Sequence, residues 1–143
     1  MSVNSNNPAY VFDSFALLAY LNGETGRERV VEILTRSLAG EMRTLLCSIN
    51  LGEILDTLER RRGLVQAQRA QALIESLPII EADATRTLVL EAAHIKALHP
   101  ISYANAFVAA LALREDAIIL TGDPEFKSVQ SLVRVEWLTP TMG

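Results

Sequence analysis

Short apolar runs that alternate with helical segments constrain the fold of this chain more than any other feature. The runs are AYVFD (9–13), TLLCSI (44–49), PIIEA (78–82), AIIL (117–120) and VRVEWL (133–138). Each is short and bounded by turn or cap residues, which is typical of a buried strand. Strands alternating with helices predict a three-layer α/β/α sandwich around a mostly parallel sheet of about five strands, with the last strand at an edge.

The segments between these runs have apolar residues at helical spacing. Helices are expected at 14–21, 25–39, about 49–62, 64–77 and 84–98, and from 103 onward. The expected caps are a capping box from Thr25 to Glu28, then Ser48, Asp83 and Ser102 at the later helices. In the last helix the buried face is expected to include Tyr103 and Phe107.

The bulk composition is that of one globular domain spanning residues 1–143, with a polar and frayed start at 1–8. Half of the residues are apolar, and the single Cys47 lies between apolar neighbours, as a buried thiol in a reducing compartment would. Neither a signal peptide nor a membrane span is visible, so we expect a cytoplasmic protein. The net charge of −4 argues against a general nucleic-acid coat protein but not against a nuclease with local contacts.

Polar side chains follow the strands at the points where ligands bind in parallel sheets. They are Asp13 and Ser14 after the first run, Glu53 near the start of the third helix, Asn105 near the start of the last helix, and Thr121 and Asp123 after the fourth run. Three acids gathered at one sheet edge repel one another unless a cation neutralises them. Because every donor is an oxygen, Mg²⁺ or Mn²⁺ is the expected ion.

Each residue also has a purely structural interpretation. Asp13 and Asp123 are good helix caps, the latter because it precedes a proline. Glu53 near a helix start would favour the helix dipole, and Asn105 could satisfy a turn. A shared metal site and a set of independent caps therefore both remain open.

The order of segments resembles the PIN domain, especially the VapC-like toxins of bacterial toxin–antitoxin pairs. The resemblance covers about residues 9 to 138 and rests on YVFDSFALLAYLNGETG, SINLGEILD, ISYANAFVAALAL and AIILTGDPEF. It implies a Mg²⁺- or Mn²⁺-dependent ribonuclease. Asp13, Glu53, Asn105 and Asp123 would be metal ligands, and Thr121 and Ser14 would be hydroxyls that orient carboxylates or touch phosphate.

Asn105 departs from the family, which has a third acid at this position. An amide oxygen can bind a hard cation but carries no charge, so metal binding and water activation should be weaker. Either a natural protein of lowered activity or an Asp→Asn substitution accounts for Asn105. The main alternative function is a catalytically impaired PIN-fold module that binds RNA or protein.

The resemblance also implies partners. These are an RNA substrate, a VapB-like antitoxin whose tail fills the acidic groove, and a second copy in a homodimer. The apolar stripes of helices 25–39 and 65–77 would supply such contacts, although core packing explains them equally well. The run Arg60, Arg61 and Arg62 is either a solvated helix end or an edge that binds phosphate. A receiver domain and a haloacid-dehalogenase-type phosphatase are disfavoured, since no second acid accompanies Asp13.

Overall fold

A computed structural model describes residues 7–138. Its strands are β1 (Ala9–Phe12), β2 (Arg43–Cys47), β3 (Ile80–Ala82), β4 (Ile118–Thr121) and β5 (Val135–Trp137). Its helices are α1 (Ser14–Asn22), α2 (Arg27–Leu38), α3 (Ser48–Arg62), α4 (Leu64–Ser76), α5 (Arg86–Leu98), α6 (Tyr103–Glu115) and the 3₁₀ helix η1 (Pro124–Val129). Most of the predicted frayed start, residues 1–6, lies outside the described residues, whereas Asn7 donates a hydrogen bond to the carbonyl oxygen of Gly40.

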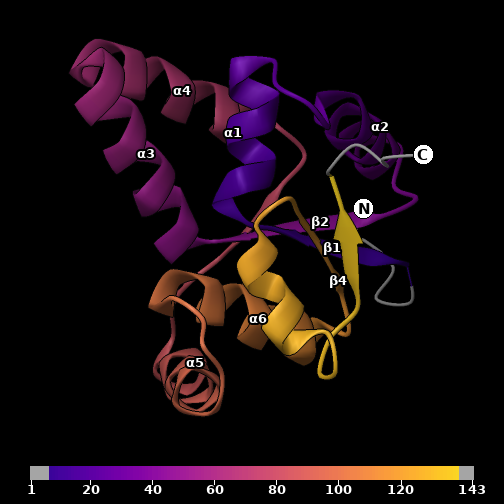
Figure 1. The fold of residues 1–143 in the computed structure, drawn as a ribbon. Helices are drawn as coiled ribbons and strands as arrows, with labels where there is room; N and C mark the ends of the chain where they lie inside the picture. Colours follow the sequence, from indigo (N-terminus) through magenta and orange to yellow (C-terminus); the bar gives the residue numbers. More distant parts are fainter. Residues whose placement is uncertain (1–6, 139–143) are drawn as a thin grey trace.

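The five strands form one parallel sheet in the order β3-β2-β1-β4-β5. The chain adds strands outward from β1 to β3 and then returns to place β4 on the other side of β1. Figure 1 shows β2, β1 and β4 side by side in the middle of the molecule. The order therefore reverses between β1 and β4, which is the switch point where α/β sheets bind ligands. The predicted three-layer α/β/α fold and the edge position of the last strand are confirmed.

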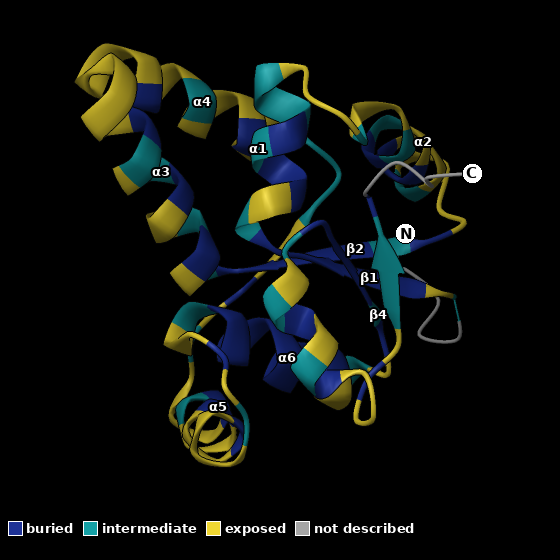
Figure 2. Ribbon diagram, viewed as in Figure 1, coloured by how far each residue is buried: buried dark blue, intermediate teal, exposed yellow. Residues whose placement is uncertain are grey.

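Helices cover both faces of the sheet, because alternate residues of each strand point to opposite sides. Along β1, Tyr10 and Phe12 pack with the helices α1 to α4, whereas Ala9 and Val11 pack with α5, α6 and η1. Figure 1 shows these two helical layers above and below the strands. The strands in the middle are buried and the outward helix faces are exposed (Figure 2), which explains why the strands read as continuous apolar runs.

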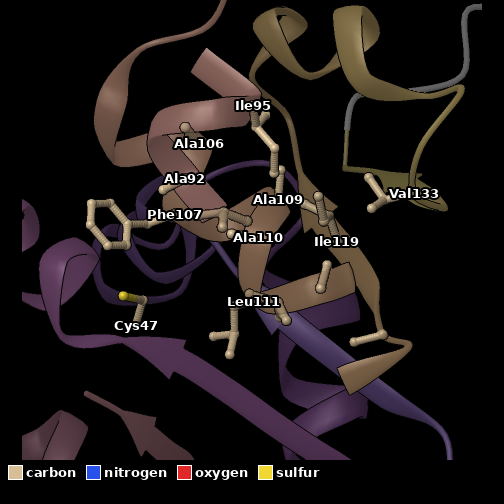
Figure 3. Close-up of a cluster of buried hydrophobic side chains, with 14 of the residues drawn as sticks. Cys47, Ala92, Ile95, Ala106, Phe107, Ala109, Ala110, Leu111, Ile119 and Val133 are labelled. Atoms are coloured by element: carbon tan, nitrogen blue, oxygen red, sulfur yellow. The ribbon is translucent and has the colours of Figure 1, made fainter. Parts of the chain in front are cut away.

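Helix α6 is the most deeply buried helix of the lower layer. Every residue from 105 to 112 is buried, including Phe107 and Leu111 (Figure 3). Alanines at 106, 109, 110 and 112 let the helix lie close to β1 and β4. Tyr103 is 43% exposed, so its predicted burial is wrong; its ring packs on Phe107 at 5.0 Å between centroids. Cys47 is buried in this layer as predicted.

Three of the predicted helix caps are wrong, although the helices themselves are present. Helix α2 begins at Arg27 after Gly26, so Thr25 and Glu28 form no capping box. Ser48 is the first residue of α3 and donates to Glu81 Oε2 at 2.7 Å. Thr85, and not Asp83, caps α5 by accepting from the Leu88 amide. In each case the start shifts by one or two residues, where local sequence signals compete most closely.

A polar cluster fastens the edge strand β5 to the rest of the fold. Glu136 accepts hydrogen bonds from the Tyr10 hydroxyl at 2.7 Å and from Arg29 Nε at 2.7 Å. The link therefore joins β5 to the central strand and to α2, so the last strand is held by side chains as well as by its pairing with β4. Within residues 7–138 no helix is both long enough and apolar enough to span a membrane.

Candidate active site

The switch point brings Asp13 and Thr121 into direct contact. In the sheet register Phe12 pairs with Leu120, so the next residue of each strand continues side by side at the carboxyl edge. The Thr121 hydroxyl donates a short hydrogen bond to Asp13 Oδ2. Asp13 Oδ1 accepts from the Ala16 amide at 2.9 Å and so caps α1. The structural interpretation of Asp13 as a cap is therefore right, and the same carboxylate also lies at the predicted meeting point.

The Asp13 carboxyl is held in a position that is unfavourable for a negative charge. Only 1% of the residue is exposed, and this burial raises the pKa of Asp13 to about 7. The hydrogen bonds from Thr121 and Ala16 lower the pKa, and the nearby charge of Asp123 raises it further. A buried carboxylate with a second carboxylate beside it is stabilised by a cation or by a proton.

Asp123 is held by its own loop and by α6. Its amide donates to Thr121 Oγ1 at 2.9 Å, and its Oδ1 accepts from the Glu125 amide at 2.9 Å, capping η1. Its Oδ2 accepts from Asn105 Nδ2 at 3.0 Å. Asp13, Thr121, Asp123 and Asn105 thus form one connected group, drawn from the ends of β1 and β4 and the start of α6.

The turn between Thr121 and Asp123 depends on a glycine. A Cβ added at Gly122 would lie 2.3 Å from the Phe15 ring, so only a glycine allows this ring to lie so close to the turn. Because Phe15 belongs to the first turn of α1, the contact brings the start of that helix against the loop that carries Asp123.

Glu53 reaches the site through Ser14. The Ser14 hydroxyl lies within a short hydrogen bond of Glu53 Oε1 and 3.5 Å from the Asn50 carbonyl oxygen. Asn50 is buried, and its Nδ2 points to the carbonyl oxygen of Ala104 at 3.4 Å, whereas its Oδ1 has no partner among the described residues. The start of α3 is therefore tied both to α1 and to the start of α6, and all six of the predicted site residues lie at this edge.

Sequence reasoning missed Glu125. Its Oε1 accepts from Asn105 Nδ2 at 2.9 Å and from the Ser102 amide at 2.5 Å, at the start of α6. Burial pushes the pKa of Glu125 upward, but the hydrogen bonds from Ser102 and Asn105 and the charge of Lys96 outweigh it, and the pKa lies below its usual value. The signal in the sequence is its position two residues after Asp123, in the first turn of η1.

Carboxylate and hydroxyl oxygens converge at this edge, beside the nitrogen of the Asn105 amide, and these oxygens are the ligands that a hard divalent cation prefers. Asp13 and Asp123 would supply the charge. Within residues 7–138, no three His, Cys, Asp or Glu side chains are grouped as a metal site. Asn105 directs its nitrogen at Asp123, and Glu53 is directed at Ser14.

The arginine run lies at the far end of α3 from Glu53. Arg60 pairs with Asp56 at 2.9 Å, and both side chains are exposed. Arg62 and Arg69 line a small pocket of about 180 Å³ with Asn22, between α1, α3 and α4. These arginines therefore lie among α1, α3 and α4, away from the carboxyl edge of the sheet that carries Asp13.

The PIN domain family matches residues 10–132 of this chain. The chain belongs to the PIN domain family. The match spans β1 to the end of η1, so it includes every residue of the candidate site. No curated protein matches the chain significantly.

Solved structures of VapBC proteins and of a VapC toxin share this fold. A chain of VapBC2 from Rickettsia felis, solved with promoter DNA, superposes with a TM-score of 0.71 at 16% identity, covering 90% of this chain and 97% of that one. DNA-bound VapBC from Salmonella typhimurium gives 0.68 at 18% identity, covering 92% and 99%. VapC20 of Mycobacterium tuberculosis, described as a toxin that cleaves the sarcin-ricin loop, gives 0.65 at 21% identity, covering 85% and 94%.

Proposed function

We propose that this PIN protein is a Mg²⁺- or Mn²⁺-dependent endoribonuclease and the toxin of a toxin–antitoxin pair, with an activity weakened by Asn105. The observation that carries this proposal is the buried Asp13 carboxylate, held by Thr121 beside Asp123 at the switch point of the sheet. Both acids also cap helices, but burying one carboxylate beside another is unfavourable unless a cation or a proton neutralises them. The similarity to VapC20, described as a toxin that cleaves the sarcin-ricin loop, supports the choice of RNA.

The residues of the site would divide the work of phosphodiester hydrolysis between them. A bound divalent ion would polarise the scissile phosphate and lower the pKa of a water molecule. Asp13 and Asp123 would hold the ion, with Thr121 fixing the rotamer of Asp13. Glu53 would orient water from the side of Ser14, which holds its carboxylate. Asn105 would contribute at most its amide oxygen, which brings no charge.

Contacts to the RNA backbone would come from positive side chains outside the acidic edge. Arg62 and Arg69 are the best candidates, because they line a shared pocket, whereas Arg60 is engaged by Asp56. Their contribution would be general attraction to phosphate and would weaken with salt.

The partners proposed for the chain are a VapB-like antitoxin and a second copy of itself. The VapBC complexes among the similar structures support the antitoxin. Exposed apolar side chains on α4, namely Leu64, Val65 and Leu73, offer a surface for such contacts. The stripe on α2 offers less, because Val30 and Leu34 are buried in the core and only Leu38 is fully outside. Such a ribonuclease would meet its substrate in the cytoplasm.

The second candidate function is a binding module of the PIN fold without catalysis. Asn105 favours it, because its nitrogen faces Asp123 where the nuclease would need a third carboxylate. In this alternative the carboxyl edge of the sheet would bind RNA or protein, and the buried Asp13 would serve only as the cap of α1.

Metal binding and RNA cleavage by the chain as given, beside Asn105→Asp, separate these functions. Titration calorimetry with Mg²⁺ and Mn²⁺ should show tighter binding by Asn105→Asp, and a gel assay should show faster cleavage of structured RNA. The double variant Asp13→Asn, Asn105→Asp is the matched control and should lose both. If Asn105→Asp neither binds the ions nor cuts RNA, the nuclease proposal is wrong and the binding module is favoured.

A further inference from the structure

The amide of Asn105 joins two carboxylates that would otherwise repel each other. Its Nδ2 lies 3.0 Å from Asp123 Oδ2 and 2.9 Å from Glu125 Oε1. Carboxylates only accept hydrogen bonds, so the nitrogen of the amide, and not its oxygen, must face them. One neutral group thus satisfies two acids that lie close together with only 7% of Asn105 exposed.

Glu125 is fixed independently of Asn105. Its Oε1 accepts the backbone N–H of Ser102, the residue that caps α6, at 2.5 Å. The start of a helix favours a negative charge, so this carboxylate is stabilised there. Glu125 therefore cannot turn away from Asn105 without leaving the Ser102 amide unpaired.

We propose that Glu125 is a positioning residue and that Asn105 is a neutral bridge between Asp123 and Glu125, which replaces at this point the cation that three acids would need. The bridge sets the orientation of the amide, because one planar group cannot direct its nitrogen and its oxygen at the same carboxylate. To ligate an ion beside Asp123 through its oxygen, Asn105 must rotate and break both hydrogen bonds.

An aspartate in place of Asn105 would turn the attraction between residue 105 and the carboxylates of Asp123 and Glu125 into repulsion. The new carboxylate would face Asp123 and Glu125 with no proton to donate, and three carboxylates would crowd into a partly buried space. The metal-free protein should then be less stable, and it should gain stability from a divalent ion. This part of the inference rests on the proposed function, whereas the bridge itself does not.

A swap of donor and acceptor tests the bridge. In the double variant Asn105→Asp, Glu125→Gln, a neutral amide replaces the carboxylate that would repel the introduced aspartate, and the glutamine oxygen can still accept from Ser102. The matched control is Asn105→Asp, Glu75→Gln, which has the same net charge but changes an exposed acid on α4. The measurement is thermal unfolding by circular dichroism near neutral pH, first with a chelator and then with Mg²⁺ or Mn²⁺.

Without metal, Asn105→Asp should melt several degrees below the unchanged protein. Glu125→Gln should restore most of that loss and Glu75→Gln none of it. The bridge is rejected if Asn105→Asp melts with the unchanged protein, or if both glutamines restore it equally. If Asn105→Asp does not fold, the two double variants decide. The bridge is supported if only the variant with Glu125→Gln folds, and it is rejected if neither double variant folds.

The melting experiments with Mg²⁺ or Mn²⁺ test the proposed function separately from the bridge. Mg²⁺ or Mn²⁺ should raise the melting temperature of Asn105→Asp by several degrees and that of the unchanged protein much less. A selective rescue by Glu125→Gln without any metal effect would confirm the bridge and contradict the metal-dependent nuclease.

Discussion

Thr121 donates a hydrogen bond to the buried carboxylate of Asp13 across 108 positions of sequence. The same oxygen of Thr121 accepts the amide of Asp123 at 2.9 Å. A single hydroxyl therefore links the end of β1 to the loop after β4 and connects the two acids of the site.

Removing this hydroxyl should destabilise the fold. Thr121→Val keeps the shape of the side chain but leaves one Asp13 oxygen and the Asp123 amide without a partner. We expect the free energy of unfolding to fall by about 1–3 kcal/mol. Urea denaturation measures it, with Thr87→Val on the exposed side of α5 as the control, which should change little. Equal losses in the two variants would contradict a linking role for Thr121.

Asp13→Asn should stabilise the metal-free protein at alkaline pH. Burial raises the pKa of Asp13 to about 7 from an ordinary value of 3.8. The contribution of Asp13 is therefore most favourable below its ordinary pKa and is lost as the pH rises through about 7. Asparagine carries no charge, so Asp13→Asn should gain on the order of 2 kcal/mol near about pH 8 and much less near about pH 4. Unfolding curves at both pH values measure the difference. A gain that is the same at both pH values would contradict the raised pKa.

Glu136→Gln should weaken the attachment of β5 at neutral pH. The hydrogen bond from Arg29 is the main reason that the pKa of Glu136 is lowered, and the Tyr10 hydroxyl adds to it. Its contribution is present above the ordinary pKa and disappears as the pH falls through the lowered one. Both side chains are about a third exposed, so solvent limits the loss to on the order of 1 kcal/mol. Glu32→Gln, a more exposed partner of the same arginine, should cost less in the same denaturation assay.

Gly26→Ala should destabilise the start of α2. Gly26 has φ +95, and an added Cβ would lie 2.9 Å from Leu138 Cβ. Backbone strain and this contact should together cost about 1–3 kcal/mol in the free energy of unfolding. Gly52→Ala in α3 is the control, because nothing lies within 4 Å of its added Cβ and alanine favours a helix. It should leave the stability unchanged or raise it slightly.

The sheet and the group of site residues could be predicted from the sequence because both follow from backbone geometry. Apolar runs buried on both faces indicate parallel strands, and parallel strands bring Asp13 and Thr121 to one edge. The N-caps of α2 and α5 could not be predicted from the sequence. Thr25 and Asp83 are residue types that cap helices as well as Gly26 and Thr85, which hold these positions in the structure. The role of Glu125 could not be predicted, because its partners Ser102 and Asn105 lie next to it only once the start of α6 meets η1.

The pairing of β1 with β4 has a consequence for how the protein is made. The acid at position 13 is synthesised first, and the Thr121 hydroxyl that completes its surroundings follows 108 positions later, with Asp123 two residues after it. A nascent chain that has not yet reached Thr121 therefore carries only part of this group of side chains, which can assemble only once β4 has been synthesised and has paired with β1.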